Sequence, residues 1–340
     1  MYKIQMRLTG LFAAGAAVLL VAGCGTAAGS GQTDDAFTVG MTLPTAQNST
    51  IEAIADGLRA EVENAGGKLV TADSQLQIDK QISDIDTFIS EEVDAIVVFP
   101  LDFPTLKNVL ERADKAGIAL FAHDALMTNA TPETLSPVRA QVMTGRSQQA
   151  EEAADFIEQQ TGGTGKVAAI GIAAPVNTNI FLLDKFSQQV KQRPNLELVG
   201  QKGNPTDDAA GARPLAEGFL TQHPDLSAVF TYNDPSAIGA AAAAAAAGKD
   251  VVVTGFNASQ DGLDAVKSGA IDATWDYKPV EIGQTLGRLA IESAVKGNEV
   301  GLNYQMDVAM VTKKNVDSFV PWDDRVKQIE DGKYLGLPIE

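Results

Sequence analysis

The sequence predicts an α/β fold of two similar halves, each a doubly wound parallel sheet with helices on both faces. From Phe37 onward, short β-prone runs alternate with longer segments of helical periodicity, which is the pattern of parallel strands joined by crossover helices. The alternation breaks once, at the irregular segment 128–137, and then resumes. A chain of 340 residues is long enough for each half to bury its own core.

The elements of the first half follow from short apolar runs and helical stripes. Isoleucines at Ile78, Ile82, Ile85 and Ile89 recur every three or four residues and therefore share one helix face. The predicted strands are 37–41, 68–72, 95–99 and 118–123, and the predicted helices are 51–62, 78–89 and 106–115.

The second half repeats this order, beginning with an extended segment at 138–144. The predicted helices are 151–160, 179–191, 215–222 and 235–247, and the predicted strands are 167–172, 196–201, 228–232 and 251–256. Eight alanines at 240–247 indicate a closely packed helix, since alanine has the highest helix propensity.

The N-terminus has the pattern of an export signal. Lys3 and Arg7 precede an apolar run at 8–21 that is too short to span a membrane comfortably. Residues 21–24 (Val-Ala-Gly-Cys) resemble a bacterial lipobox, so Cys24, the sole cysteine, is the predicted lipid attachment site, after a signal peptide at 1–24. The small, polar segment 25–36 indicates a flexible tether.

The charge balance argues against some partners. Acidic residues outnumber basic ones by 44 to 26, giving a formal net charge of −18, so a nucleic-acid backbone would be repelled. Association with a membrane is expected through the acyl group on Cys24 and not through surface charge.

Six segments together resemble the ribose/galactose-type periplasmic-binding family. They are Asp56-Gly57, 94–98, 116–119, 223–226, 228–234 and 253–257. The resemblance covers about residues 37–310, and the runs AVFTYND (228–234) and VTGFN (253–257) are its most specific parts.

This resemblance implies the type I periplasmic-binding fold, in which two Rossmann-like lobes with parallel sheets are joined by three crossing segments. The crossings would lie near 125–142, 256–258 and 275–278. The N-terminal lobe would comprise 37–143 and 277–307, and the C-terminal lobe 144–276 and 308–340.

The resemblance also implies a site for a monosaccharide or related polyhydroxylated ligand between the lobes. Carboxylates and amides suit sugar hydroxyls, which both donate and accept hydrogen bonds, and aromatic faces suit the C–H surfaces of the ring. The candidate ligand-binding residues are Asn48, Phe99, Asp124, Thr144, Asn177, Asn179, Asp207, Asn233, Asn257, Trp275, Asp276 and Tyr277. The polar candidates that follow strands are also typical helix caps. If Asp124 is a ligand contact, its replacement by Ala should remove affinity and leave the ligand-free stability unchanged.

This chain departs from the family pattern at positions that contact ribose in ribose-type members. Ribose-type members carry two adjacent phenylalanines where this chain has Thr50 and Ile51, and arginines where it has Ala125 and Leu182. A ribose pocket is therefore not expected, and the Trp275-Asp276-Tyr277 run is closer to relatives for deoxyhexoses, polyols or autoinducer-2.

The function implied is that of a monomeric, lipid-anchored, extracytoplasmic receptor that delivers its ligand to an ABC permease by hinge closure. The alternatives are a receptor that signals to a membrane sensor and, less favoured, a carbohydrate-active enzyme. A repressor of the same fold would need a helix-turn-helix where this chain has the export signal. With His123 and His223 as the only histidines, neither a metal, a cofactor nor a catalytic site is expected.

Overall fold

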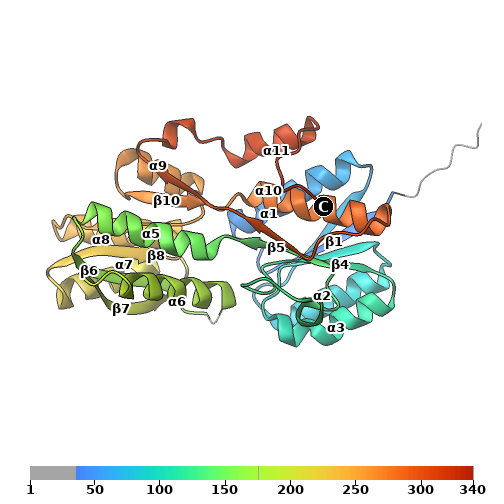
Figure 1. Ribbon diagram of the computed structural model, residues 1–340, viewed down its shortest axis with the longest axis horizontal. Coiled ribbons are helices and arrows are strands. Elements are labelled where there is room, and N and C mark those ends of the chain that lie inside the picture. The colour runs from blue at the N-terminus through green and yellow to red at the C-terminus, as the bar shows by residue number, and fades with distance from the viewer. Residues whose placement is uncertain (1–35, 175, 340) are drawn as a thin grey trace, which may run out of the picture. The chain divides into compact units, whose positions relative to one another are not determined.

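Two six-stranded sheets form the framework of the protein (Figure 1). The computed structural model describes residues 36–174 and 176–339. The first sheet contains β1 (Thr38–Leu43), β2 (Lys68–Asp73), β3 (Ala95–Val98), β4 (Ala119–His123), β5 (Ala140–Thr144) and β11 (Asn303–Met306). The second contains β6 (Gly165–Ile172), β7 (Leu196–Asn204), β8 (Leu226–Thr231), β9 (Val252–Thr254), β10 (Ala273–Asp276) and β12 (Ala309–Thr312).

The two sheets have the same topology. Their strand orders are β11-β5-β4-β3-β1-β2 and β12-β10-β9-β8-β6-β7. Neighbouring strands pair in parallel, except that β12 runs antiparallel to β10. The prediction of two similar, doubly wound halves is confirmed.

Helices cover both faces of each sheet, and capping residues set where several of them begin. They are α1 (Ser49–Asn64), α2 (Ile78–Ser90), α3 (Phe103–Lys115), α4 (Pro132–Leu135), α5 (Arg146–Gln160), α6 (Asn177–Lys191), α7 (Ala209–Gln222), α8 (Asp234–Ala246), α9 (Gln260–Ser268), α10 (Pro279–Ala290) and α11 (Trp322–Glu330), with the π-helix η1 (Ile291–Val295) and the 3-10 helix η2 (Val316–Ser318). Predicted starts at 106 and 151 were late, because the side chain of Asp102 caps α3 and α5 begins directly after Gly145.

Helices α1 and α10 touch backbone to backbone, although α1 ends at Asn64 and α10 begins only at Pro279. A Cβ on Gly57 would lie 2.1 Å from the carbonyl oxygen of Val280, and one on Gly283 would lie 1.9 Å from that of Ile54. Only glycine permits this approach, which explains Gly57 in the motif Asp56-Gly57. The polyalanine helix α8 packs similarly, since a Cβ on Gly239 would meet α7.

The chain passes between the two sheets at 144–146, 276–279 and 306–309. Two predicted crossings were wrong. Segment 125–139 stays with the first sheet, because Ala130 and Leu135 are buried in its helical layer, and Ala258 is buried with the helices of the second sheet. The crossing predicted at 275–278 is present.

The C-terminal segment also differs from the prediction. Strand β12 joins the second sheet, but α11 then packs on α1 and α10 of the first half. Ile329 is fully buried against Ala53, Ala60 and Val280. Residues 322–339 therefore belong with the N-terminal lobe, because the apolar face of α11 fits the outer surface of the α1–α10 pair.

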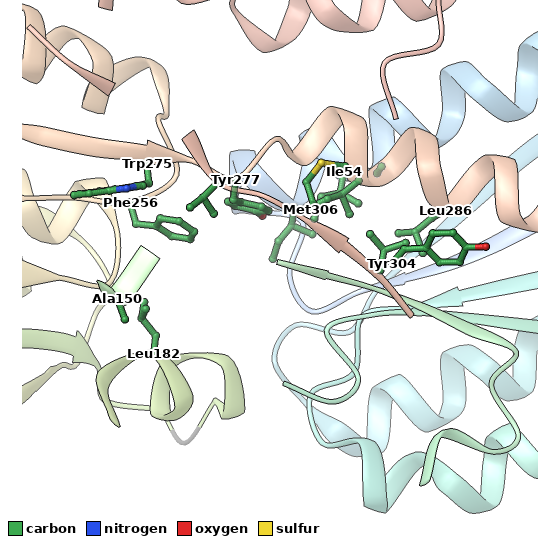
Figure 2. Close-up of a cluster of buried hydrophobic side chains, with 14 of the residues drawn as sticks. Ile54, Ala150, Leu182, Phe256, Trp275, Tyr277, Leu286, Tyr304 and Met306 are labelled. Atoms are coloured by element: carbon green, nitrogen blue, oxygen red, sulfur yellow. The ribbon is translucent and has the colours of Figure 1, made fainter. Parts of the chain in front are cut away.

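One buried cluster continues from the first sheet to the second. Figure 2 shows Phe256, Trp275 and Tyr277 in this cluster, along with Ile54 and Leu286 from the helices of the first half. Phe256 lies two residues after β9, Trp275 lies within β10, and Tyr277 directly follows β10. The core therefore includes the segments that connect the halves.

The predicted export signal, Cys24 and nearly all of the tether fall within residues 1–35, outside the described part of the chain. Over the residues that are described, no helix combines the length and the apolar character needed to cross a bilayer.

Candidate functional site

Three of the candidate ligand-binding residues follow strands and hold positive φ angles. The values are 49° for Asp124 after β4, 57° for Asp207 after β7 and 114° for Asn257 after β9. Such conformations cost up to about 1–3 kcal/mol each outside glycine and cluster at functional sites. All three lie at carboxyl ends of strands, where doubly wound sheets bind ligands.

Asp124 forms a buried ion pair with Arg146. Its Oδ2 accepts hydrogen bonds from Nε and Nη2 of Arg146 at 3.3 and 3.2 Å, and its Oδ1 accepts one from the backbone N–H of Thr144 at 2.8 Å. Asp124 is 4% exposed and Arg146 is 5% exposed. The pair thus joins the end of β4 to the first residue of α5, next to the first crossing.

The guanidinium of Arg146 is held by the carboxylate of Asp124 and by the ring of Phe256. Its carbon lies 5.6 Å above the ring centroid of Phe256, a cation–π arrangement. Burial acts to lower the pKa of Arg146, but Asp124, with Tyr232 and Tyr277 nearby, outweighs burial and raises the pKa above its ordinary value. The guanidinium remains charged, and its Nη1 is buried without a hydrogen-bond partner among the described residues.

Other buried polar atoms near the same crossing are also unpartnered within the described chain. They are Nε2 of His123, Oγ1 of Thr144 and both amide atoms of Gln149. His123 Nδ1 lies 2.9 Å from the carbonyl oxygen of Val142, so Nδ1 carries the proton and Nε2 is an acceptor in the neutral ring. Burial lowers the pKa of His123, which keeps the ring neutral.

Aromatic rings line up beside this polar group. The ring of Tyr277 stacks on Phe256 at a centroid distance of 5.4 Å and lies parallel to the His123 ring at 6.4 Å. Phe99 meets His123 edge to face at 4.6 Å. Figure 2 shows Phe256 and Tyr277 side by side in the buried cluster. These rings and the polar group together offer apolar faces beside hydrogen-bonding atoms.

Asp207 and Asn233 form a second polar contact at the carboxyl edge of the second sheet. Asn233 Nδ2 donates to Asp207 Oδ1 at 2.7 Å, and Asn233 Oδ1 caps α8 by accepting from the N–H of Ser236. Desolvation raises the pKa of Asp207 to about 6, against the hydrogen bond from Asn233. Asn233 therefore is a helix cap and also contacts another candidate residue.

The family model of the periplasmic binding protein domain matches residues 39–299, more than half of the chain. The chain belongs to the periplasmic binding protein family. The predicted family resemblance is confirmed, as is the prediction of a binding protein in place of an enzyme.

Curated relatives cover most of this periplasmic binding protein. It is 28% identical to the ribose import binding protein of Bacillus subtilis over 281 residues, which are 82% of this chain and 88% of that protein. It is 25% identical to the xylitol-binding protein of Mycolicibacterium smegmatis over 317 residues, 93% of this chain and 88% of that protein.

Solved structures share the fold. An ABC transporter solute-binding protein of Burkholderia graminis in complex with D-arabinose superposes with a TM-score of 0.75 at 21% identity, covering 84% of this chain and 98% of that one. A solute-binding protein of Bacillus halodurans with bound myo-inositol gives 0.73 at 24% identity, covering 83% and 96%. The predicted type I periplasmic-binding fold is confirmed.

The remaining asparagine candidates of this periplasmic binding protein lie in different settings. Asn48 is half-buried and caps α1 by accepting from the N–H of Thr50 at 3.0 Å. Asn177 is exposed at the first residue of α6, and Asn257 is half-buried. Asn179 is 3% exposed and both ends of its amide bond the backbone of Ile172, so this side chain has a structural role.

Trp275 and Asp276 do not belong to the candidate site. The side chain of Trp275 is fully buried, and its Nε1 donates to Glu152 at 2.7 Å. Asp276 accepts from the N–H of Lys278 and lies 2.7 Å from Arg325. Their hydrogen-bonding groups are used within the protein, because β10 runs through the core between β9 and β12.

Arg146 and Gln149 were missed by sequence reasoning. One signal for Arg146 was available, since a cation in the first turn of a helix opposes the helix dipole and calls for a compensating partner. Nothing in the sequence marked Gln149, whose burial depends on how α5 packs. Within residues 36–174 and 176–339, no group of three His, Cys, Asp or Glu side chains is arranged to hold a metal ion.

Proposed function

We propose that this periplasmic binding protein is the receptor of an ABC importer and captures a monosaccharide or polyol at the carboxyl ends of its strands. The observation that supports the proposal is that Asp124, Asp207 and Asn257 each hold a positive φ angle just after the carboxyl end of a strand. Relatives named for ribose and xylitol, and solved neighbours with D-arabinose and myo-inositol, support a polyhydroxylated ligand.

The chemistry of the site suits hydroxyl groups. Each sugar hydroxyl both donates and accepts, and the residues around Asp124 and Arg146 offer donors, acceptors and aromatic rings. Phe99 and Tyr277, whose rings both pack on His123, are the proposed aromatic contacts for the C–H surface of a sugar ring. The proposed polar contacts are Asp124, Asn48, Thr144, Asn177, Asp207, Asn233 and Asn257.

Binding proceeds by closure of the two lobes about the crossing segments. Contacts from both lobes form together only in the closed state, so a ligand shifts the population toward closure. The permease then recognises the closed surface. In this proposal the receptor acts as a monomer, held outside the cytoplasm by an acyl group on Cys24.

A thermal-shift screen of the protein from Gly25 onward tests the ligand class. The library contains pentoses, hexoses, deoxyhexoses, inositols, polyols, nucleosides and autoinducer-2. A ligand at about 100 times its Kd stabilises the folded state by about 2.7 kcal/mol, which the melting midpoint reports. A hit among the carbohydrates supports the proposal, and hits confined to other solutes would overturn the sugar assignment.

Two further measurements test closure and anchoring. Small-angle scattering should show compaction when a tight ligand is added, and an unchanged radius of gyration would contradict hinge closure. In cells, the full chain should fractionate with membranes and Cys24→Ala should not. Equal membrane association of both would rule out the lipid anchor.

A further inference from the structure

We propose that Arg146 is the residue that selects the solute, by donating from Nη1 to an oxygen atom of an uncharged ligand. This inference rests on the solute-binding function proposed above and names a property of the same site. Arg146 follows β5 at the first crossing, and its Nη2 already donates a hydrogen bond to Asp124.

The geometry leaves a single edge of the guanidinium available. Nε and Nη2 both donate to Asp124 Oδ2, and the ring of Phe256 lies under the guanidinium plane. Nη1 is buried and has no acceptor anywhere in the described chain. Because the rest of the group is fixed, these N–H bonds point in a defined direction before any ligand arrives, which favours specific recognition.

The charges around Arg146 favour a neutral ligand. The carboxylate of Asp124 neutralises the guanidinium, and the other titratable groups that face it are His123, Tyr232 and Tyr277. Burial lowers the pKa of His123 and raises that of Tyr277, so both are uncharged at neutral pH. A carboxylate or phosphate would lose its hydration here without meeting an unpaired cation.

Other buried atoms that have no hydrogen-bond partner among the described residues lie near Arg146 in the sequence, and they include both donors and acceptors. Thr144 Oγ1 precedes Arg146 by two residues, and the Gln149 amide lies one helical turn after it on the same face of α5. Gln149 is fully buried and Thr144 is 7% exposed. A hydroxyl satisfies such a set better than a purely accepting group does, because it can donate as well.

Access to this edge requires motion. Nη1 is shielded from solvent, so a ligand reaches it only when the segments on either side of the 144–146 crossing separate. Closure then buries the ligand oxygen against Nη1. Arg146 therefore senses the ligand at the hinge itself.

The test compares calorimetric binding to wild type, Arg146→Gln and Arg146→Lys, with Arg139→Gln as the matched control. Arg139 immediately precedes β5, whereas Arg146 lies two residues after its carboxyl end. Arg139 donates to the hydroxyl of Ser293 in η1. The probes are D-ribose, D-arabinose, D-galactose, xylitol and myo-inositol, with 2-deoxy-D-ribose, D-fucose, D-galacturonate and D-ribose 5-phosphate as analogues.

Wild type should bind a neutral probe at least 10-fold more tightly than its anionic analogue. Arg146→Gln should lose about 10- to 100-fold for the neutral probe, the range for a hydrogen bond from a charged donor, and Arg146→Lys should recover part of the loss. Arg139→Gln should stay within about twofold of wild type. For a deoxy analogue lacking the contacted oxygen, the loss on Arg146→Gln should shrink to about threefold or less.

The outcomes separate this inference from the proposed function. If wild type binds a neutral probe and folded Arg146→Gln binds it equally well, Arg146 is structural and solute binding stands. Tighter binding of an anionic analogue by wild type would refute the neutral-ligand argument without any variant, even if Arg146→Gln does not fold. If wild type binds no probe and no member of the larger library, the proposed function fails, and the role of Arg146 fails with it.

Discussion

Replacing Asp124 by Ala should destabilise the ligand-free protein strongly. The substitution leaves the buried guanidinium of Arg146 without its counterion, and removing one partner of a buried ion pair typically costs about 3–5 kcal/mol. The backbone N–H of Thr144 also loses its acceptor, at about 1 kcal/mol. We expect a total loss of about 4–6 kcal/mol in the free energy of unfolding.

This expectation reverses the one drawn from the sequence. As a pure ligand contact, Asp124 would be replaceable without loss of ligand-free stability. The structure shows instead that both of its oxygens hold protein groups, Thr144 on one side and Arg146 on the other. A ligand contact at Asp124 would be additional to this structural role.

Urea unfolding and thermal melts of the ligand-free variants provide the assay. At about 2–4 °C per kcal/mol, the midpoint should fall by about 10 °C or more. The control is Asp94→Ala, because Asp94 also accepts a backbone N–H, from Thr38 at 2.7 Å, but is exposed and has no arginine partner within residues 36–174 and 176–339. It should lose about 1 kcal/mol.

A double variant decides whether the unpaired charge is the cause. Asp124→Ala with Arg146→Met removes both charges, so it should recover a large part of the stability lost by Asp124→Ala alone. If the double variant is no more stable than the single one, or if Asp124→Ala costs no more than Asp94→Ala, the ion-pair reasoning is refuted.

Three further predictions concern the packing and the pH dependence of stability. Gly283→Ala should lower the free energy of unfolding in urea by about 3 kcal/mol or more, because the added Cβ would force α1 and α10 apart. The control is Gly218→Ala on α7, whose Cβ would meet only the end of a lysine side chain, so it should be neutral or stabilising by up to about 1 kcal/mol. Equal effects of the two variants would contradict the backbone contact. Burial raises the pKa of Asp234 to about 7 from 3.8, so the folded state holds the proton more tightly and stability should fall as pH rises from about 4 to 7, by at most about 4 kcal/mol. Asp234→Asn should flatten this slope, and an unchanged slope would assign it to other groups. Asp207→Asn should remove a smaller part of the pH dependence of stability, between pH 4 and 6, since desolvation raises the pKa of Asp207 to about 6. Urea midpoints measured from pH 4 to 7 check both variants. A wild-type midpoint that rises with pH would show that the predicted direction of the pH dependence is wrong.

The family motifs acquire a physical meaning from the structure. In the run AVFTYND, Asn233 caps α8, while the buried carboxylate of Asp234 accepts from the backbone N–H and hydroxyl of Ser259. A Cβ on Gly255 or Gly262 would lie within 2.4 Å of that carboxylate. The motifs AVFTYND and VTGFN are therefore two sides of one contact, which fixes the loop after β9 and with it Asn257.

The sequence by itself determined the alternation of strands and helices, the two similar halves and the strand ends at which Asp124, Asn233 and Asn257 lie. These follow from local periodicity and from the residues at the ends of strands, which neighbouring residues in the chain largely control. The family resemblance rested on the same local runs.

Only the tertiary structure decided which side chains meet. It placed Trp275 in the core, packed α11 on the first half and brought Arg146 to Asp124. The physical reason is that burial and ion pairing depend on segments distant in sequence, 22 residues apart for Asp124 and Arg146 and 123 for Trp275 and Glu152. Local periodicity carries no information about such pairs, and the candidate site is built from them.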